Sequence, residues 1–128
     1  MPEIVGDFKV ANVFDGRTDG RYFIRDRPPL PPGEIRDSVL AYLRQGAVLM
    51  MARSLDPDEL DPARPDRVPV GLLTDGTWVW DASIAYYLAE HGLPPEPAFI
   101  EYLQGRNFHY EAPSRALFDA VQAAMREG

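Results

Sequence analysis

The stretch that decides the fold is residues 68–92, which read Val-Pro-Val-Gly-Leu-Leu-Thr-Asp-Gly-Thr-Trp-Val-Trp-Asp-Ala-Ser-Ile-Ala-Tyr-Tyr-Leu-Ala-Glu-His-Gly. Asp75 and Gly76 stand between two apolar runs, and this dipeptide tolerates the positive φ angles that a type I′ turn requires at both central residues. The pattern therefore predicts a tight β-hairpin with strands over 68–73 and 77–80.

Pairing across this turn sets Leu73 opposite Trp78 and Leu72 opposite Val79. Leu73, Trp78 and Trp80 then share one face of the hairpin, whereas Leu72 and Val79 share the other. Both faces are apolar. Either other elements cover both faces, or one face is left as an aromatic surface for a partner.

A helix is predicted over 82–91, since Asp81 is placed to cap its N-terminus and Gly92 to end it in the left-handed conformation. The other predicted elements are a first hairpin pairing residues 8–14 with 21–25, an amphipathic helix over 34–45 with Ile35, Val39, Leu40 and Leu43 on its apolar face, a buried strand over 47–52, a short helix near 99–103 and a last helix from about Ser114. Together these predict one α+β domain over 1–128, with an N-terminal β-hairpin, a helix, a three-stranded antiparallel meander and two or three C-terminal helices.

The composition narrows the class of protein. The 128 residues include no cysteine, which excludes a disulfide scaffold and a cysteine-based metal or redox site. The chain starts without a basic segment followed by an apolar one, and its longest apolar run, over 47–52, is too short to span a bilayer. We therefore expect a cytoplasmic protein without a membrane partner.

Charge is distributed unevenly along the chain. Residues 1–55 carry seven acidic and eight basic side chains, whereas residues 56–128 carry thirteen acidic and five basic ones, for a net charge of −7. A surface of this sign repels phosphate backbones, so nucleic acid is not expected as a partner. A basic protein partner would be attracted.

Signatures of catalysis and metal binding are missing from the sequence. There is no glycine-rich phosphate loop, no nucleophile elbow and no histidine pair at metal-ligand spacing. Residues 53–67 hold five carboxylates and are predicted to form a surface loop, which we call the acidic loop. It begins like a calcium loop, but Leu60 replaces a ligand and Arg67 stands where the bidentate glutamate belongs. We therefore expect no cofactor, no metal and no catalytic residue.

The preferred functional hypothesis is a non-enzymatic protein-binding module. Trp78 and Trp80 would anchor a partner, because indole rings offer a large rigid contact area, although both could instead be core residues. The charges around the anchors would raise the association rate. They are Asp56, Asp58, Glu59 and Asp61.

Two alternatives use other residues. A small-molecule-binding protein or enzyme would have a pocket near the 105–111 loop, with polar contacts from His109, Tyr110 and Glu111. A homodimer would form if Arg21 and Arg25 met the acidic loop of a second copy, and such contacts would be screened by salt.

The hairpin and its flanks also carry a resemblance. Val68–Trp80, with Ala85–Leu88 and Gly92–Pro97, resembles uncharacterised small acidic proteins of high-GC actinobacteria over roughly residues 40–103. The shared motifs are a turn and helix boundaries, so the resemblance implies no activity. As a small acidic α+β protein with an aromatic-rich hairpin, the chain also loosely resembles the immunity proteins that neutralise toxins.

Overall fold

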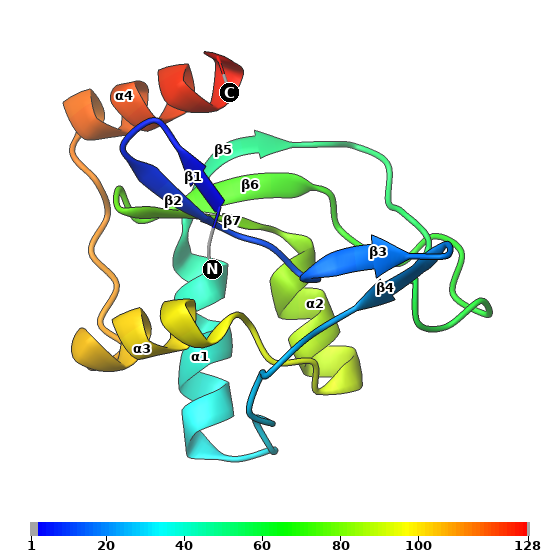
Figure 1. The fold of residues 1–128 in the computed structure, drawn as a ribbon. Helices are drawn as coiled ribbons and strands as arrows, with labels where there is room; N and C mark the ends of the chain where they lie inside the picture. The colour runs from blue at the N-terminus through cyan, green and yellow to red at the C-terminus, as the bar shows by residue number, and fades with distance from the viewer. Residues whose placement is uncertain (1–2, 128) are drawn as a thin grey trace.

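The computed structural model describes residues 3–127, and their arrangement is α+β, as predicted (Figure 1). The strands are β1 (Glu3–Val5), β2 (Phe8–Ala11), β3 (Gly16–Thr18), β4 (Arg21–Phe23), β5 (Ala47–Met51), β6 (Gly71–Thr74) and β7 (Trp78–Asp81). The helices are α1 (Glu34–Gln45), α2 (Ser83–His91), α3 (Pro97–Gly105) and α4 (Arg115–Glu127). No helix within residues 3–127 has both the length and the apolar character needed to cross a membrane.

A mixed five-stranded sheet organises the fold, with strand order β1-β2-β7-β6-β5. Strands β5, β6 and β7 form the predicted antiparallel meander. Strand β2 runs parallel to β7, which sets Val10 beside Val79 and Ala11 beside Trp80. The N-terminal segment thereby becomes part of the main sheet instead of a separate hairpin packed on it.

The predicted pairing of residues 8–14 with 21–25 is wrong. Strand β2 pairs with β1 and β7, and β3 pairs with β4 in a second, two-stranded sheet. Two tight turns explain the difference. Gly6, with a φ of 60°, lies in the turn between β1 and β2. Asp19 and Gly20, with φ values of 52° and 79°, connect β3 to β4. Positive φ at both central residues is what a type I′ turn requires.

The turn between β6 and β7 is wider than the predicted type I′ turn. Only Gly76 of the central pair has a positive φ, of 95°. The Asp75 carboxylate instead accepts hydrogen bonds from the N–H groups of Thr77 and Trp78, both at 2.9 Å. An aspartate that binds the backbone ahead of it in this way specifies a turn by its side chain.

The wider turn shifts the strand register by two residues. Leu73 lies opposite Trp80 rather than Trp78. Side chains alternate between faces with a period of two, so this shift leaves every residue on its predicted face. Leu73 packs with Trp78 and Trp80 in one core cluster, while Leu72 packs near Val79 in the other.

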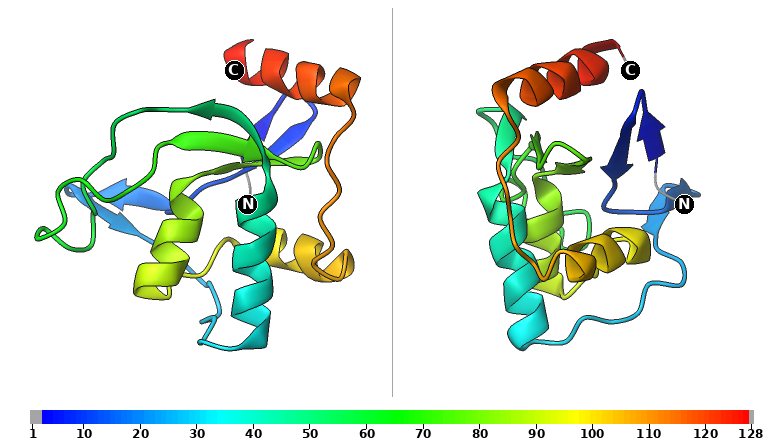
Figure 2. Two further views of the ribbon diagram at one scale, coloured as in Figure 1. Left: turned by 180° about the vertical axis from the view of Figure 1, so that it is seen from behind. Right: turned by 90° about the vertical axis from the view of Figure 1, so that its left-hand side faces the viewer.

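Helices cover both faces of the main sheet (Figure 2). Helices α1, α2 and α3 pack on the tryptophan face and supply most of the larger core cluster. Helix α4 lies across the opposite face, where Val121 packs against Val10 and Val79. Neither face is therefore left as the open aromatic surface that the sequence analysis weighed as one alternative.

Helix α1 has the predicted bounds, but the side chains that it buries differ in part from the prediction. Val39, Leu40 and Leu43 are buried, whereas Ile35 is 52% exposed. Tyr42 is completely buried instead. A phenol hydroxyl needs a hydrogen-bond partner when it is buried, and Tyr42 finds one outside its own helix, as described below.

The apolar run over 47–52 is not a buried strand. Strand β5 lies at the edge of the sheet, and Val48, Met50 and Met51 are 51%, 50% and 48% exposed. Leu49, in the middle of β5, is half-buried and packs against the cluster beneath α4. An edge strand has a neighbour on one side only, so an apolar composition does not guarantee burial.

Candidate functional site

The two tryptophans are core residues, which overturns their predicted role as exposed anchors. Each is 1% exposed. The ring of Trp78 lies 4.8 Å from that of Phe99, measured between centroids, and the indole N–H of Trp80 donates to the Leu43 carbonyl at 3.1 Å. Neither indole is exposed enough to anchor a partner protein.

Asp58 is buried as well, and it is not a charge at the rim of a surface. Its carboxylate accepts hydrogen bonds from the Tyr86 hydroxyl at 2.7 Å and from the Leu60 N–H at 2.8 Å, and it pairs with Nε2 of His91 at 2.6 Å. Burial acts to raise the pKa of Asp58, but the hydrogen bonds from His91 and Tyr86 outweigh it, so the pKa lies below its usual value. Asp58 thus fastens the acidic loop to α2.

Replacing Asp58 with asparagine is expected to lower the free energy of unfolding at pH 7 by about 1–3 kcal/mol. A carboxylate with a lowered folded-state pKa contributes stability that is complete above about pH 4 and is lost as the pH falls through that lower pKa. Urea denaturation between pH 7 and pH 3 should therefore show a shallower loss of stability for the variant. The control is Asp66→Asn, an exposed position of the same loop, for which a change below about 0.5 kcal/mol is expected. A wild-type pH profile in the Asp58 variant would contradict this account.

Two of the three residues predicted for a pocket near 105–111 are mostly exposed to solvent. The side chains of His109 and Glu111 are 73% and 71% exposed, and their closest charged atoms are 3.8 Å apart. Tyr110 has a structural role, because its hydroxyl accepts from the Ala47 N–H at 2.9 Å and donates to the Thr74 carbonyl at 3.0 Å.

A buried polar cluster around Asp75 was missed by the sequence analysis. The hydroxyls of Tyr42 and Tyr102 donate to one carboxylate oxygen of Asp75, at 2.5 and 2.7 Å. Burial, followed by the bond to Asp75, raises the pKa of both phenols, so both remain protonated donors. The other carboxylate oxygen holds the turn, and the cluster is therefore a structural device of the fold.

Arg21 and Arg25 are both exposed, and Arg25 lies just beyond the end of β4. The Arg25 guanidinium lies over the ring of Phe23, 4.7 Å from its centroid. Self-association through these arginines and the acidic loop of a second copy remains a prediction, which size-exclusion chromatography at low and high salt would test.

The remaining acidic residues divide between two environments. Asp61 is used within the loop, where its carboxylate pairs with Arg64 at 3.2 Å. Asp56 and Glu59 border a groove between the β3–β4 sheet and the loop. Within residues 3–127 no basic side chain lies within 4 Å of either carboxylate. Both charges are therefore available to an external cation.

We call this feature the acidic groove, and it has a volume of about 400 Å³. Its polar border includes Asp56, Glu59 and Asp81, and its aromatic border is Phe14, Tyr22 and Tyr87. The ring of Phe14 stacks on Tyr22 at 4.7 Å and meets Tyr87 edge-on at 5.4 Å. The Arg17 guanidinium lies 5.2 Å from the centroid of the Tyr22 ring, so this ring already accepts a cation of the chain itself.

Sequence reasoning found the acidic part of the groove but not its aromatic part. Asp56 and Glu59 were predicted from the charge of the loop. Phe14 and Tyr22 lie more than 30 residues earlier in the chain, and the strand that carries Tyr22 was predicted to pair with residues 8–14 instead of with β3. No family model, curated protein or solved structure matches the chain.

Proposed function

We propose that this protein is a non-enzymatic binding module, of the immunity-like or accessory kind, that recognises a basic segment of a partner protein. The observation that carries the proposal is the acidic groove, in which unpaired carboxylates and exposed aromatic surface border the same hollow. The aromatic contact comes from Phe14 and Tyr22 rather than from the buried tryptophans.

Arginine fits this combination of groups better than other side chains do. Its planar guanidinium can stack on an aromatic ring and at the same time donate two hydrogen bonds to a carboxylate. Arg17 over Tyr22 provides the stacking half of this geometry within the chain. A partner arginine would add the pairing half at Asp56 or Glu59.

The charge of the whole chain supports the same class of partner. A net charge of −7 attracts a basic protein over a distance of about one Debye length, which raises the association rate more than the final affinity. Specificity would then come from the contacts inside the groove. Binding is accordingly expected to weaken as the salt concentration rises.

The test uses a short peptide with the sequence acetyl-Gly-Arg-Gly-Arg-Gly-amide, titrated into ¹⁵N-labelled protein. We expect chemical-shift changes around Tyr22 and Glu59, and at least a tenfold loss of affinity in the double variant Asp56→Asn/Glu59→Gln, about 1.4 kcal/mol. The Tyr22→Ala variant should lose affinity as well, and Tyr22 is 40% exposed, so its removal leaves the core intact. A glutamate version of the peptide should not bind.

The matched control is Asp7→Asn/Glu127→Gln, which removes two exposed carboxylates outside the groove. It should bind the arginine peptide with nearly wild-type affinity. If both double variants lose affinity equally, the peptide responds to net charge alone and the groove is not the recognition site. If neither loses affinity, the proposal is wrong.

A further inference from the structure

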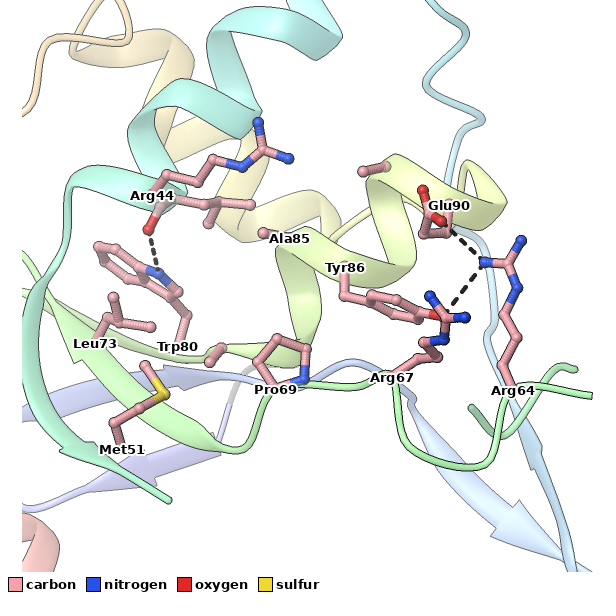
Figure 3. A pocket seen from close by; sticks show the side chains of 13 residues that line it. Arg44, Met51, Arg64, Arg67, Pro69, Leu73, Trp80, Ala85, Tyr86 and Glu90 are labelled. Carbon is pink, nitrogen blue, oxygen red and sulfur yellow. Dashed lines mark hydrogen bonds and ion pairs between the residues drawn. The ribbon is translucent and has the colours of Figure 1, made fainter. Parts of the chain in front are cut away.

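A second and larger hollow lies on the other side of the acidic loop, between the C-terminal end of α1, the outer face of α2 and the β5–β6 side of the sheet (Figure 3). We call it the arginine cleft, and its volume is about 630 Å³. Pro69 borders both this cleft and the acidic groove, so the two hollows are neighbours with different linings.

The floor and walls of the cleft are apolar. Leu73, Trp80 and Pro69 form the floor in Figure 3, and Met51 reaches in from the edge strand. Small side chains border the cleft at Ala85 and Ala89 of α2 and at Ala82, the residue just before this helix. Residues three and four apart lie on one side of a helix, so these alanines together leave room where larger residues would fill the space.

Three guanidinium groups surround this apolar hollow, in a chain whose net charge is −7. Arg64 is neutralised by Glu90 at 2.9 Å and by Asp61 at 3.2 Å. For Arg44 and Arg67, by contrast, no carboxylate lies within 4 Å in the part of the chain that the structure describes.

Cationic side chains lie at both ends of the cleft. Arg44 lies at the α1 end, whereas Arg64 and Arg67 lie at the opposite end, beside the hydroxyl of Tyr86 (Figure 3). The Tyr86 hydroxyl donates to the buried Asp58 at 2.7 Å, so its ring is held in place as a wall of the cleft. An anionic group at the Tyr86 end would meet an unpaired guanidinium that is positioned next to a fixed aromatic ring.

We infer that the arginine cleft binds a small organic anion, with a flat or branched apolar body and a carboxylate or phosphate group. The apolar body would lie on Leu73, Pro69 and the alanines of α2, and the anionic group would pair with Arg67 or Arg44. Guanidinium groups bind both oxyanions with two parallel hydrogen bonds, and the cleft has the size usual for small-molecule sites. This site is independent of the acidic groove and takes a ligand of opposite charge.

The test compares five small probes that differ in charge and in apolar body. Phenyl phosphate and benzoate carry both features, benzyl alcohol lacks the charge, benzylamine reverses it, and inorganic phosphate lacks the apolar body. We expect phenyl phosphate or benzoate to bind with a dissociation constant of about 1 mM, the range for so few atoms, and to shift the indole N–H signal of Trp80. The other three probes should bind at least tenfold more weakly. Whichever of the two anions binds more tightly identifies the oxyanion.

Two variants and one charge-matched control locate the binding. The double variant Arg44→Gln/Arg67→Gln should lose at least tenfold in affinity, whereas Arg21→Gln/Arg126→Gln, which removes the same charge elsewhere, should not. Ala85→Leu should block the cleft while leaving every charge in place. Equal binding of benzyl alcohol and benzoate, or an unchanged affinity in both Arg44→Gln/Arg67→Gln and Ala85→Leu, would overturn the inference. Neither result bears on the acidic groove, whose probe is a cationic peptide.

Discussion

Replacing Asp75 with alanine is expected to lower the free energy of unfolding by about 3–5 kcal/mol, because removing one partner of a buried charged network leaves the others unsatisfied. Four donors lose their acceptor in this variant. They are the hydroxyls of Tyr42 and Tyr102 and the N–H groups of Thr77 and Trp78. Urea denaturation followed by far-ultraviolet circular dichroism measures the effect.

Milder variants of the same cluster separate the charge from the hydrogen bonds. Tyr42→Phe and Tyr102→Phe each remove one donor and leave the carboxylate bound by the other three, so a loss of about 1–2 kcal/mol is expected for each. Asp75→Asn keeps one acceptor oxygen for the turn and should fall between these variants and Asp75→Ala. A loss below about 1 kcal/mol for Asp75→Ala would show that the cluster does not hold the turn.

The Asp75 cluster also explains why the hairpin was predicted correctly in its faces and wrongly in its register. The dipeptide Asp75 and Gly76 is a strong local signal for a type I′ turn. The tyrosines that hold the carboxylate lie 33 and 27 residues away, in α1 and α3. No local pattern reveals such partners, whereas the alternation of apolar residues is local and survives a shift of two.

Burial of the chain's apolar and acidic segments was harder to predict than secondary structure. The run over 47–52 forms a strand, as its composition indicates, but its place at the edge of the sheet leaves three of its side chains half exposed. Asp58 has the same local character as Asp56 and Glu59. It is buried because His91 and Tyr86 of α2 bind it. That contact depends on the tertiary structure, so the local sequence does not reveal it.

The two candidate sites also differ in how far local sequence could predict them. The acidic side of the groove could be predicted from the charge of one loop, because neighbouring charges in a loop stay close together in space. The arginine cleft takes its cations from α1 and from the segment that includes Arg64 and Arg67, and its apolar floor from the sheet. Residues that meet only through the fold carry no shared sequence signal.

Replacing Trp80 with alanine is expected to cost about 3–5 kcal/mol of stability, the usual range for removing a buried aromatic side chain. The ring is 1% exposed and packs against Tyr42 and Phe99. Its loss would also leave the Leu43 carbonyl without the indole N–H. A protein that kept its melting temperature but lost a partner would instead support the original idea of an exposed anchor.

Gly46 provides a second, independent probe of the same packing. Its φ is −52°, which any residue can adopt, so backbone strain does not explain the glycine. A Cβ at this position would lie 2.5 Å from Cζ2 of Trp80 and 2.8 Å from Cβ of Leu73. Gly46→Ala should therefore cost about 1–3 kcal/mol through overpacking. In a Trp80→Phe background the clash with the indole is removed but the one with Cβ of Leu73 remains, so the same substitution should cost less there without becoming free. Equal costs in the two backgrounds would show that the indole does not press against this turn.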